Sequence, residues 1–437
     1  MIINFSVQNF GSIKEKQTLS FLANKSDHLE DYYIIEPIKG LRLNKLALIY
    51  GANASGKTTV LKALDFLRNI CTEPFDKKNE KFDFEPFLFD ENTPKENTKF
   101  ELDFLQNGVR YYYEVEVNQN CVVKEKLFNY NPNKAVVFER TTNEKKELTS
   151  IIFGNKIEKR KNLKESLELH TLWNNSVFGG FMKSNVDSQE LSSAHYWFDE
   201  VLANFFSTKA DAKDFFTEQL DLKRLNKRVI LSFLKKADIN IFDIEISKRE
   251  DSKLIELLES SIKKTKDQDK IKHYKNLLNS DFTINRNLHF FHNVNNNLYK
   301  LNLGQESDGT QRYFEYSGLL SLLLSKQSIF LIDELEFSLH PDLFQHFLLT
   351  FLVNSKKSQI IATTHNREIL NNRDIFRDDA IWFTDKNDDS ATELYSLADF
   401  DSSVVRDTSN VLNAYKSGKL GGVPNLGDYY IDLEDEE

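Results

Sequence analysis

The sequence predicts a mixed α/β fold, in which a parallel sheet core carries an antiparallel β part and is interrupted by a helical insertion. Strand-like apolar runs alternate with helix-like segments near both ends of the chain, in 1–70 and 300–400. Such alternation is typical of a parallel sheet covered by helices. The intervening residues change from alternating strands at 99–140 to charged segments with helical spacing. We therefore expect both ends of the chain to contribute strands to one sheet.

Composition indicates a soluble globular protein. The chain has 437 residues, of which 40% are hydrophobic and 28% charged, and its net charge is −10. This charge argues against a general polyanion binder, although it does not exclude a local basic groove. The two cysteines form neither a disulfide framework nor a zinc-type spacing. With no signal-peptide pattern at the N-terminus and no apolar run of about 20 residues, we expect a cytoplasmic protein without a membrane span.

The N-terminal part contains the clearest strand signals. "IINFSVQNF" alternates apolar and polar residues and predicts a strand, with "QTLSFLA" as its partner. "KLALIY", at 45–50, precedes a glycine turn and is typical of a buried parallel strand. "KFELDFLQNGVRYYYEVEV" predicts a hairpin at Asn107–Gly108, because Asn-Gly suits the tight turn between two strands. "CVVKEKLFNY" and "AVVFER" extend it to an antiparallel sheet at 99–140.

The middle of the chain, 141–284, predicts a mainly helical insertion. It is dense in Lys and Glu and poor in Gly and Pro. One strand is expected at 239–247, and two short amphipathic helices are expected around the charged segment 263–270. The apolar seam is too short for a long coiled coil.

The strand–helix alternation returns from residue 328. "SIFLID", a helix from Pro341, "QIIATTH", "AIWFTD" and "TELYSL" follow one another. The sequence thus predicts one domain formed by 1–140 and 285–425, with an acidic tail at 426–437.

"GANASGKT" matches the phosphate-loop pattern G-x-x-x-x-G-K-[ST] and lies between a predicted strand and a predicted helix. Its glycines let backbone N–H groups point at phosphate oxygens, and the helix N-terminus favours an anion. Lys57 is expected to reach the β- and γ-phosphates of ATP, and Thr58 to ligate Mg²⁺. The residues predicted to hold the nucleotide are Gly51, Asn53, Ala54, Ser55, Gly56, Lys57, Thr58 and Thr59.

Two carboxylates end the strand "SIFLIDE". Beside a phosphate loop, such a strand end can hold Mg²⁺, and Asp333 is the predicted metal-side residue. Glu334 is the predicted general base that activates the attacking water. Glu336 either contacts the metal shell or a partner, or is an ordinary surface carboxylate. The sequence leaves both interpretations open.

His365, in "TTHN", follows the next predicted strand. A lone histidine after a strand is usually structural. His365, however, lies one helix after the Asp333 strand. This position favours a catalytic role in contact with the γ-phosphate.

"ESDGTQRY", at 306–313, precedes the acidic strand and opens a predicted helix. Taken alone, it predicts a polar turn with Ser307 or Asp308 as the N-cap. Together with the motifs above, the chain resembles the ABC-type ATPase superfamily, in which a signature segment stands at this place. The resemblance gives Ser307 and Gly309 the places of the signature Ser and Gly, and makes "SLHPD" at 338–342 the D-loop.

The resemblance implies an ABC-type ATPase head that works as a pair. Its signature helix completes the nucleotide site of a facing subunit, so that Ser307 and Gly309 would bind the γ-phosphate held by the other chain. ATP would join a head-to-head dimer or higher oligomer, and hydrolysis would release it.

Several segments in the same order are similar to the SMC- and OLD-like ATPases of bacterial anti-phage defence, the RloA and abortive-infection group. They include "INFSVQNFGSIKEKQTLSF", "LGQESDGTQR", "IDELEFSLHP" and "AYKSGKLGGVPNL". Where that group usually has a basic residue in "NFxS", this chain has Gly11. The resemblance implies a separate effector protein as partner, with a nuclease as one candidate, because the residues after His365 are too few for a TOPRIM domain.

Three functional hypotheses remain from the sequence. The first is an ATP-hydrolysing switch that controls an effector in anti-phage defence. The second is an SMC- or repair-type ATPase associated with DNA, which would need a long coiled coil or a basic groove. The third is an assembly scaffold that binds ATP with little turnover, against which the intact Glu334 argues.

Overall fold

The computed structural model describes residues 1–155, 161–207, 211–400 and 411–424. They divide into two compact units. Unit 1 comprises 1–208, 326–336 and 352–437, and unit 2 comprises 209–325 and 337–351. The predicted acidic tail at 426–437 lies outside the described residues. No helix among the described residues is long and apolar enough to cross a membrane.

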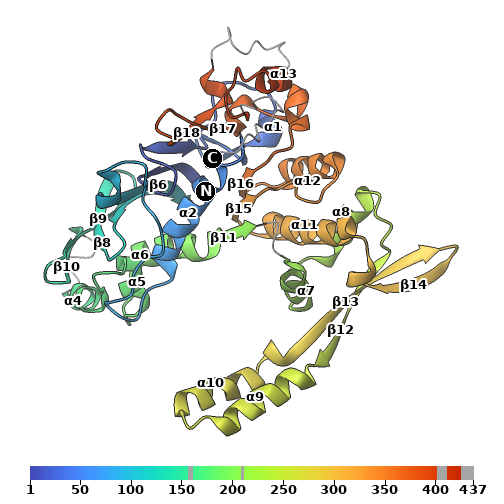
Figure 1. Cartoon of the computed structure of the whole chain (residues 1–437), viewed down its shortest axis with the longest axis horizontal. Coiled ribbons are helices and arrows are strands. Elements are labelled where there is room, and N and C mark those ends of the chain that lie inside the picture. Colours follow the sequence, from blue (N-terminus) through green and yellow to red (C-terminus); the bar gives the residue numbers. More distant parts are fainter. Residues whose placement is uncertain (156–160, 208–210, 401–410, 425–437) are drawn as a thin grey trace, which may run out of the picture. The chain divides into compact units, whose positions relative to one another are not determined.

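The core of unit 1 is a largely parallel sheet with the strand order β11-β15-β16-β5-β17-β18 (Figure 1). The strand bounds are β5 Leu46–Gly51, β11 Leu202–Ser207, β15 Ile329–Asp333, β16 Gln359–Thr363, β17 Ile381–Lys386 and β18 Thr392–Ser396. β5 pairs in parallel with β16 on one side and β17 on the other, and β18 pairs with β17 in the antiparallel sense. The prediction that both chain ends build one sheet is therefore confirmed.

A second, antiparallel sheet in unit 1 has the order β10-β9-β8-β7-β6-β1-β2. Its strands are β1 Ile2–Gln8, β2 Gln17–Ser20, β6 Thr98–Gln106, β7 Val109–Val117, β8 Val122–Tyr130, β9 Lys134–Asn143 and β10 Leu148–Phe153. The hairpin at Asn107–Gly108 is confirmed, because Gln106 pairs with Val109 across the turn. A small hairpin, β3 Ile34–Ile38 and β4 Leu41–Asn44, completes the strands of this unit. The mixed α/β class with a parallel core and an antiparallel part is confirmed.

The segment 141–284 contains more strand than the sequence predicts. β10 extends the antiparallel sheet, and β11 pairs in parallel with β15 at the edge of the core sheet. The prediction of a mainly helical segment rested on its Lys- and Glu-rich composition. That composition reflects exposed helices, whereas the short run "LANFFS" of β11 gains its strand partner only through tertiary pairing.

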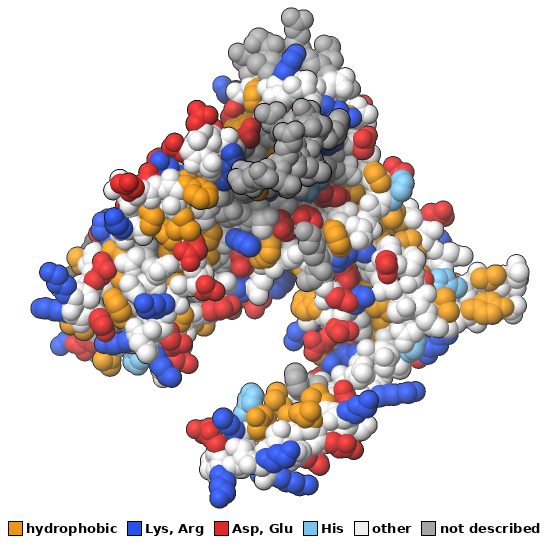
Figure 2. Space-filling view, in the orientation of Figure 1, with side chains coloured by type: hydrophobic (Ala, Val, Ile, Leu, Met, Phe, Trp, Pro, Cys, Tyr) orange, Lys and Arg blue, Asp and Glu red, His pale blue; other side chains and the backbone are white. Residues whose placement is uncertain are grey.

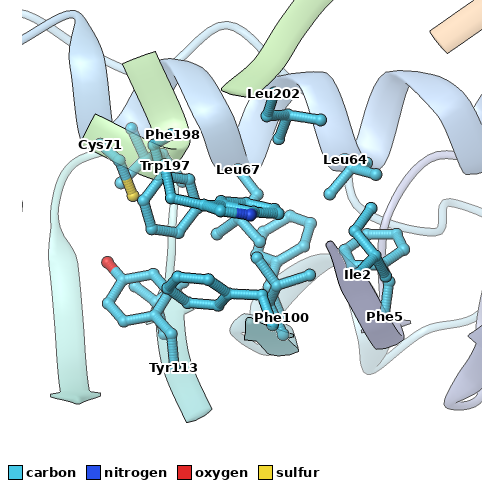
Figure 3. Packing of buried hydrophobic residues seen from close by; sticks show 14 of the residues in the cluster. Ile2, Phe5, Leu64, Leu67, Cys71, Phe100, Tyr113, Trp197, Phe198 and Leu202 are labelled. Carbon is cyan, nitrogen blue, oxygen red and sulfur yellow. The ribbon is translucent and has the colours of Figure 1, made fainter. Parts of the chain in front are cut away.

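Helices of unit 1 cover the sheets. They are α1 Glu30–Tyr33, α2 Lys57–Thr72, α4 Lys161–His170, α5 Val177–Met182, α6 Gln189–Tyr196 and α13 Val411–Lys416, with a π-helical turn, η2, at Trp197–Val201. The buried face of α2 packs on the antiparallel sheet, and Figure 3 shows Trp197 among Leu67, Phe100 and Tyr113. Trp197 also lies 4.4 Å from Phe104, measured between ring centroids. Burying each such large apolar side chain contributes roughly 1.5 to 3 kcal/mol.

Unit 2 combines helices with a three-stranded antiparallel sheet, β12-β13-β14. Its elements are α7 Lys213–Asp221, α8 Lys227–Lys236, β12 Asp243–Glu250, α9 Ser252–Lys264, α10 Gln268–Leu278, β13 Ile284–Val294, β14 Asn297–Asn302, α11 Asp308–Ser325 and most of α12, Pro341–Asn354. Figure 1 shows β12 and β13 leading to the helical hairpin of α9 and α10. The two predicted amphipathic helices around 263–270 and the helix from Pro341 are thus confirmed.

A buried polar cluster ties α2 to the antiparallel sheet. The hydroxyl of Tyr113 donates to Glu125 Oε1 at 2.9 Å, and the backbone N–H of Val177 donates to Glu125 Oε2 at 2.9 Å. Cys71, near the end of α2, hydrogen-bonds Tyr113, and Arg140 lies opposite Glu125 in the strand pairing. Burial raises the pKa of the Glu125 carboxyl to about 7, against the opposing effects of Arg140 and the two hydrogen bonds.

This raised pKa predicts a pH dependence of stability that Glu125→Gln removes. Between the ordinary Glu pKa of 4.5 and about 7, the folded chain keeps a proton that the unfolded chain has lost. The free energy of unfolding therefore falls as pH rises through this window, by roughly 3 kcal/mol from this group. Urea unfolding at pH 5, 6, 7 and 8 should show the wild type losing stability relative to Glu125→Gln. Glu114→Gln, on the neighbouring strand β7, is the control. Parallel pH curves for wild type and Glu125→Gln would contradict the assignment.

Candidate nucleotide site

The phosphate loop connects β5 to α2, and its backbone follows from its small residues. Gly56, which precedes the first residue of α2, has φ 103°, and Ala54 has φ 63°. A Cβ at Gly56 would collide with Thr392 Oγ1 and would lie 2.9 Å from Ser12 Oγ. Glycine is therefore required at this position by conformation and by space.

Hydroxyl groups from distant segments form the wall behind this loop. Ser55 Oγ lies 2.6 Å from Thr384 Oγ1, and Thr392 Oγ1 donates to the Ser55 carbonyl at 2.9 Å. Ser12 Oγ contacts both Thr392 Oγ1, at 2.8 Å, and Thr59 Oγ1, at 3.1 Å. This network fixes the loop against β17 and β18.

Gly11 also has a structural place in this wall. Its φ is 54°, and a Cβ there would lie 3.0 Å from Thr59 Cγ2. A side chain at residue 11 would therefore press on the first turn of α2. The positive φ and this packing both favour glycine at residue 11.

Lys57 points back along its own loop. Its Nζ donates to the carbonyls of Gly51 and Ala52, at 2.9 Å each, and the residue is 6% exposed. Burial lowers its pKa, while the nearby carboxylates of Asp333, Glu334 and Glu336 act to raise it. The loop thus carries a cation that its own carbonyls hold at the place where phosphate oxygens would lie.

The acidic strand end meets the phosphate loop directly. Thr58 Oγ1 donates to the two carboxylate oxygens of Asp333 at 3.0 and 3.1 Å, and Thr363 Oγ1 donates to Asp333 Oδ1 at 2.6 Å. The backbone N–H of Glu334 donates to Thr363 Oγ1 at 2.8 Å. Glu334 itself has φ 53°, a left-handed conformation that is uncommon for this residue type. Thr363, at the end of β16, therefore orients both predicted acidic residues.

Glu336 and His365 form a second contact in the same unit. The backbone N–H of His365 donates to Glu336 Oε1 at 2.5 Å. Burial and the charge of Lys57 lower the pKa of the His365 ring, although Glu336, Glu334 and Asp333 oppose this. The imidazole is therefore predominantly neutral at pH 7.

Two polar atoms near this contact have no hydrogen-bond partner among the described residues. They are Glu336 Oε2 and the hydroxyl of Tyr50, both shielded from solvent. The charge of Glu336 acts to raise the pKa of Tyr50, in addition to its burial. Glu336 is thus built into the site, which favours the first of its two sequence interpretations over a plain surface carboxylate.

The oxygen donors present suit Mg²⁺. Mg²⁺ in nucleotide sites is held by one or two protein oxygen groups, with phosphates and water completing its shell. Thr58 and Asp333 supply such a hydroxyl and carboxylate, already in contact. Within the described residues there is no group of three or more His, Cys, Asp or Glu that could hold a metal ion.

Ser307 and Gly309 belong to unit 2, whereas the phosphate loop, Asp333, Glu334 and His365 belong to unit 1. Ser307 Oγ accepts from the backbone N–H of Thr310 at 3.2 Å, so Ser307 is the N-cap of α11. Ser307 is exposed. Within unit 2, the start of α11 and Ser338 of the predicted D-loop line a polar pocket of about 190 Å³. The capping role that the sequence alone predicts is confirmed.

Residues 46–371 match the family described as "AAA domain, putative AbiEii toxin, Type IV TA system". The chain belongs to this family. The matched range contains the phosphate loop, the Asp333 strand and His365. No curated protein matches the chain.

Solved structures of SMC heads are similar to this AAA-domain chain at low identity. The SMC head domain from Thermotoga maritima has 13% identity and a TM-score of 0.40, with 90% of this chain and 98% of that chain covered. An SMC head bound to the C-winged helix domain of ScpA has 10% identity and a TM-score of 0.42, with 90% and 97% covered.

The sequence did not indicate that Ser12, Thr384 and Thr392 contact the phosphate loop. Thr384 and Thr392 lie more than 300 positions after the phosphate loop, within strands that carry no motif. Ser12 lies in "NFGS", a segment that was noted only for its lack of a basic residue. The strand predictions at "AIWFTD" and "TELYSL" were the available signal, because β17 pairs with β5 and β18 pairs with β17.

Replacing Gly56 by alanine should disrupt nucleotide binding more than the same change at Gly40. Both glycines have positive φ, but nothing lies within 4 Å of a Cβ at Gly40, whereas one at Gly56 collides with Thr392. Gly40→Ala should therefore cost about 1 kcal/mol of unfolding free energy and leave ATP affinity unchanged. Gly56→Ala should weaken ATP binding at least tenfold in a titration with a fluorescent ATP analogue. Equal affinities for the two variants would contradict the geometry.

Proposed function

We propose that this protein is an ATP-binding and ATP-hydrolysing switch, which dimerises or oligomerises around ATP and controls a separate effector protein in anti-phage defence. The observation that carries the proposal is the contact of Thr58 with Asp333, in which the first turn after a complete phosphate loop meets the acidic end of a parallel strand. Sites that transfer phosphoryl groups need this arrangement of a phosphate cradle, a metal-side carboxylate and a cation.

Each residue has a definite task in this proposal. Lys57 leaves the loop carbonyls for the β- and γ-phosphates, while Thr58 and Asp333 hold Mg²⁺. A bound Mg²⁺ supplies positive charge that offsets the charge developing on the phosphates. Glu334 accepts the proton of the attacking water. Its left-handed backbone is fixed through the hydrogen bond from its N–H to Thr363.

His365 serves as the reporter of the γ-phosphate. A neutral imidazole carries no charge and can still donate one hydrogen bond to a phosphate oxygen. The lowered pKa keeps this form at pH 7. Glu336, which holds the backbone of His365, places the ring relative to the end of β16.

The signature residues Ser307 and Gly309 act on the ATP of a facing subunit. The exposed cap of α11 offers a hydroxyl and backbone N–H groups at a helix N-terminus, where an anion is favoured. Gly309 supports this interpretation, because its φ is not positive and a Cβ would meet only Ser307 Oγ, at 3.9 Å. The fold of the chain itself does not require glycine there, whereas a close approach by a second molecule does.

The defence role rests on the family description, which names a putative toxin of a toxin–antitoxin system, and on the resemblance to abortive-infection ATPases. A two-state assembly driven by ATP is suited to hold or release a toxic effector, for example a nuclease encoded separately.

Glu334→Gln should trap an ATP-joined assembly, because the amide cannot accept the proton of the attacking water. Size-exclusion chromatography with light scattering, in ATP and Mg²⁺, should show a dimer or larger species that the wild type forms only transiently. Adding Gly309→Leu should abolish it, because the larger side chain blocks the facing subunit.

Gly309→Leu alone provides the control for this experiment. Its open surroundings predict unchanged thermal stability and unchanged ATP binding by the monomer. A Glu334→Gln chain that stays monomeric with ATP contradicts the proposed sandwich. Weak ATP binding by the Gly309→Leu monomer would return this segment to a purely structural role.

Lys57→Ala should abolish protection from phage in cells that carry the gene with its neighbours. Lys62→Ala, on the exposed face of the same helix, removes an equal charge without touching the loop and should leave protection intact. Plaque counts against a phage panel measure the difference. Full protection by Lys57→Ala would remove ATP from the defence mechanism.

A role on DNA remains the second candidate because unit 2 contains a lysine-rich pair of helices, α9 and α10. Its helical hairpin, 252–278, has seven lysines and four acidic residues, in a chain of net charge −10. Figure 2 shows basic side chains along α9 and α10. Salt-dependent DNA binding by the purified chain would favour this candidate. Equal, near-zero ATPase rates for wild type and Glu334→Gln would favour an assembly scaffold.

A further inference from the structure

The first turn of α11 contains a side chain that reaches back to the residue before Ser307. Gln311 is buried, and its Nε2 donates to the Glu306 carbonyl at 2.7 Å. The backbone N–H of Gln311 donates to the Ser307 carbonyl at 2.9 Å. His292 of β13 holds the Glu306 side chain as well, because its Nε2 lies 2.7 Å from Glu306 Oε1. Gln311 therefore binds both peptide units that flank the Ser307 side chain.

Lys213, the first residue of α7, determines which way the Gln311 amide faces. Its Nζ donates to Gln311 Oε1 at 2.8 Å. A lysine ammonium can only donate hydrogen bonds, whereas a glutamine amide has an accepting oxygen and a donating nitrogen. The oxygen must therefore face Lys213, and this leaves the NH₂ group directed at the Glu306 carbonyl. Without the ammonium, the amide loses the partner that sets its orientation.

α7 itself has a fixed position on α11, and Figure 1 shows the two helices side by side within unit 2. The backbone N–H of Ala212 donates to Glu315 Oε1 at 3.3 Å. Phe216 packs so closely on α11 that a Cβ at Gly318 would collide with its ring. Asp211 pairs with the Lys213 ammonium at 3.0 Å. These contacts hold the ammonium at the start of α11.

The contact of Lys213 with Gln311 lies beside residues that the proposed function assigns to a facing subunit. Both side chains line the polar pocket of about 190 Å³ that includes Ser338 of the predicted D-loop. A group that acts on a reacting phosphate must be held within about 0.5 Å of its productive position, through supporting hydrogen bonds. A misplacement of about 1 Å can cost about 100-fold in rate. The orientation of Gln311 therefore matters for Ser307.

We propose that Lys213 is a positioning residue for the signature segment. It orients the Gln311 amide, and Gln311 places Ser307 for the γ-phosphate of ATP held by a facing subunit. Lys213 contacts no nucleotide in this role and acts only through Gln311. The inference rests on the proposed function, because it concerns the pairing of two ATP-bound subunits. Loss of the ammonium weakens that pairing, while the phosphate loop in unit 1 still binds ATP.

Lys213→Met keeps the apolar stem of the side chain and removes the donor. Combined with Glu334→Gln, it should raise the protein concentration needed for half-maximal assembly in ATP and Mg²⁺ about tenfold, as expected for losing a hydrogen bond to a charged group. Analytical ultracentrifugation over a series of protein concentrations measures this shift. The thermal midpoint and the affinity of the monomer for a fluorescent ATP analogue should not change. Lys235→Met, at an exposed lysine of α8, should assemble as Glu334→Gln alone does.

A double-mutant cycle tests the route through Gln311. Gln311→Met should weaken assembly by at least the same factor as Lys213→Met. Adding Lys213→Met to it should weaken assembly little further, because both changes remove the same contact. Lys213→Arg restores a cation that only donates and should recover most of the assembly. Effects of the two substitutions that multiply independently would contradict the proposed route.

The outcomes separate a failure of this inference from a failure of the proposed function. If Glu334→Gln assembles and the added Lys213→Met leaves every assembly curve unchanged, the positioning role is wrong and the ATP switch stands. If Lys213→Met lowers the thermal midpoint together with assembly and Lys213→Arg restores neither, Lys213 has only a structural role and the inference is overturned. If Glu334→Gln alone does not assemble with ATP, the proposed sandwich fails and the role of Lys213 fails with it.

Discussion

The parallel alignment of β15, β16 and β5 is the constraint on which the site depends. Because the carboxyl ends of parallel strands share one edge of the sheet, Asp333, Thr363 and the phosphate loop after Gly51 emerge side by side. The contact of Thr58 with Asp333 joins residues 275 positions apart in the sequence. Thr363, on the strand between them, hydrogen-bonds the Asp333 carboxylate and the Glu334 N–H. The middle strand thus sets the positions of both acids.

The antiparallel sheet helps to position the phosphate-loop edge of the core sheet, because it packs against α2. Apolar packing with Leu64 and Leu67 holds the helix that begins at the phosphate loop, while Tyr113 and Glu125 hold its far end through Cys71. A helix fixed at both ends keeps its N-terminal N–H groups directed at one place. The hydroxyl contacts of Ser12, Thr384 and Thr392 restrain the loop itself.

Local patterns made much of the fold predictable. The apolar run before the phosphate loop, the Asn-Gly hairpin and the helix from Pro341 each depend on neighbouring residues, and the structure confirms them. β11 could not be found in this way, because "LANFFS" is short and lies among charged helices, and its strand state comes from pairing with β15. Ser12, Thr384 and Thr392 were missed for the same kind of reason. Each is an ordinary hydroxyl residue whose importance comes from contacts across hundreds of residues.

The sequence by itself determined the phosphate loop, the acidic strand end, a helix cap at Ser307 or Asp308 and the alternation that makes an α/β core. These features need only the residue types and spacing that chain chemistry dictates over a few positions. Tertiary structure alone decided that Thr363 orients two acids and that Glu336 holds the backbone of His365. The physical reason is that hydrogen-bond partners and burial depend on which strands become neighbours, and strand order is set by the packing of the whole unit.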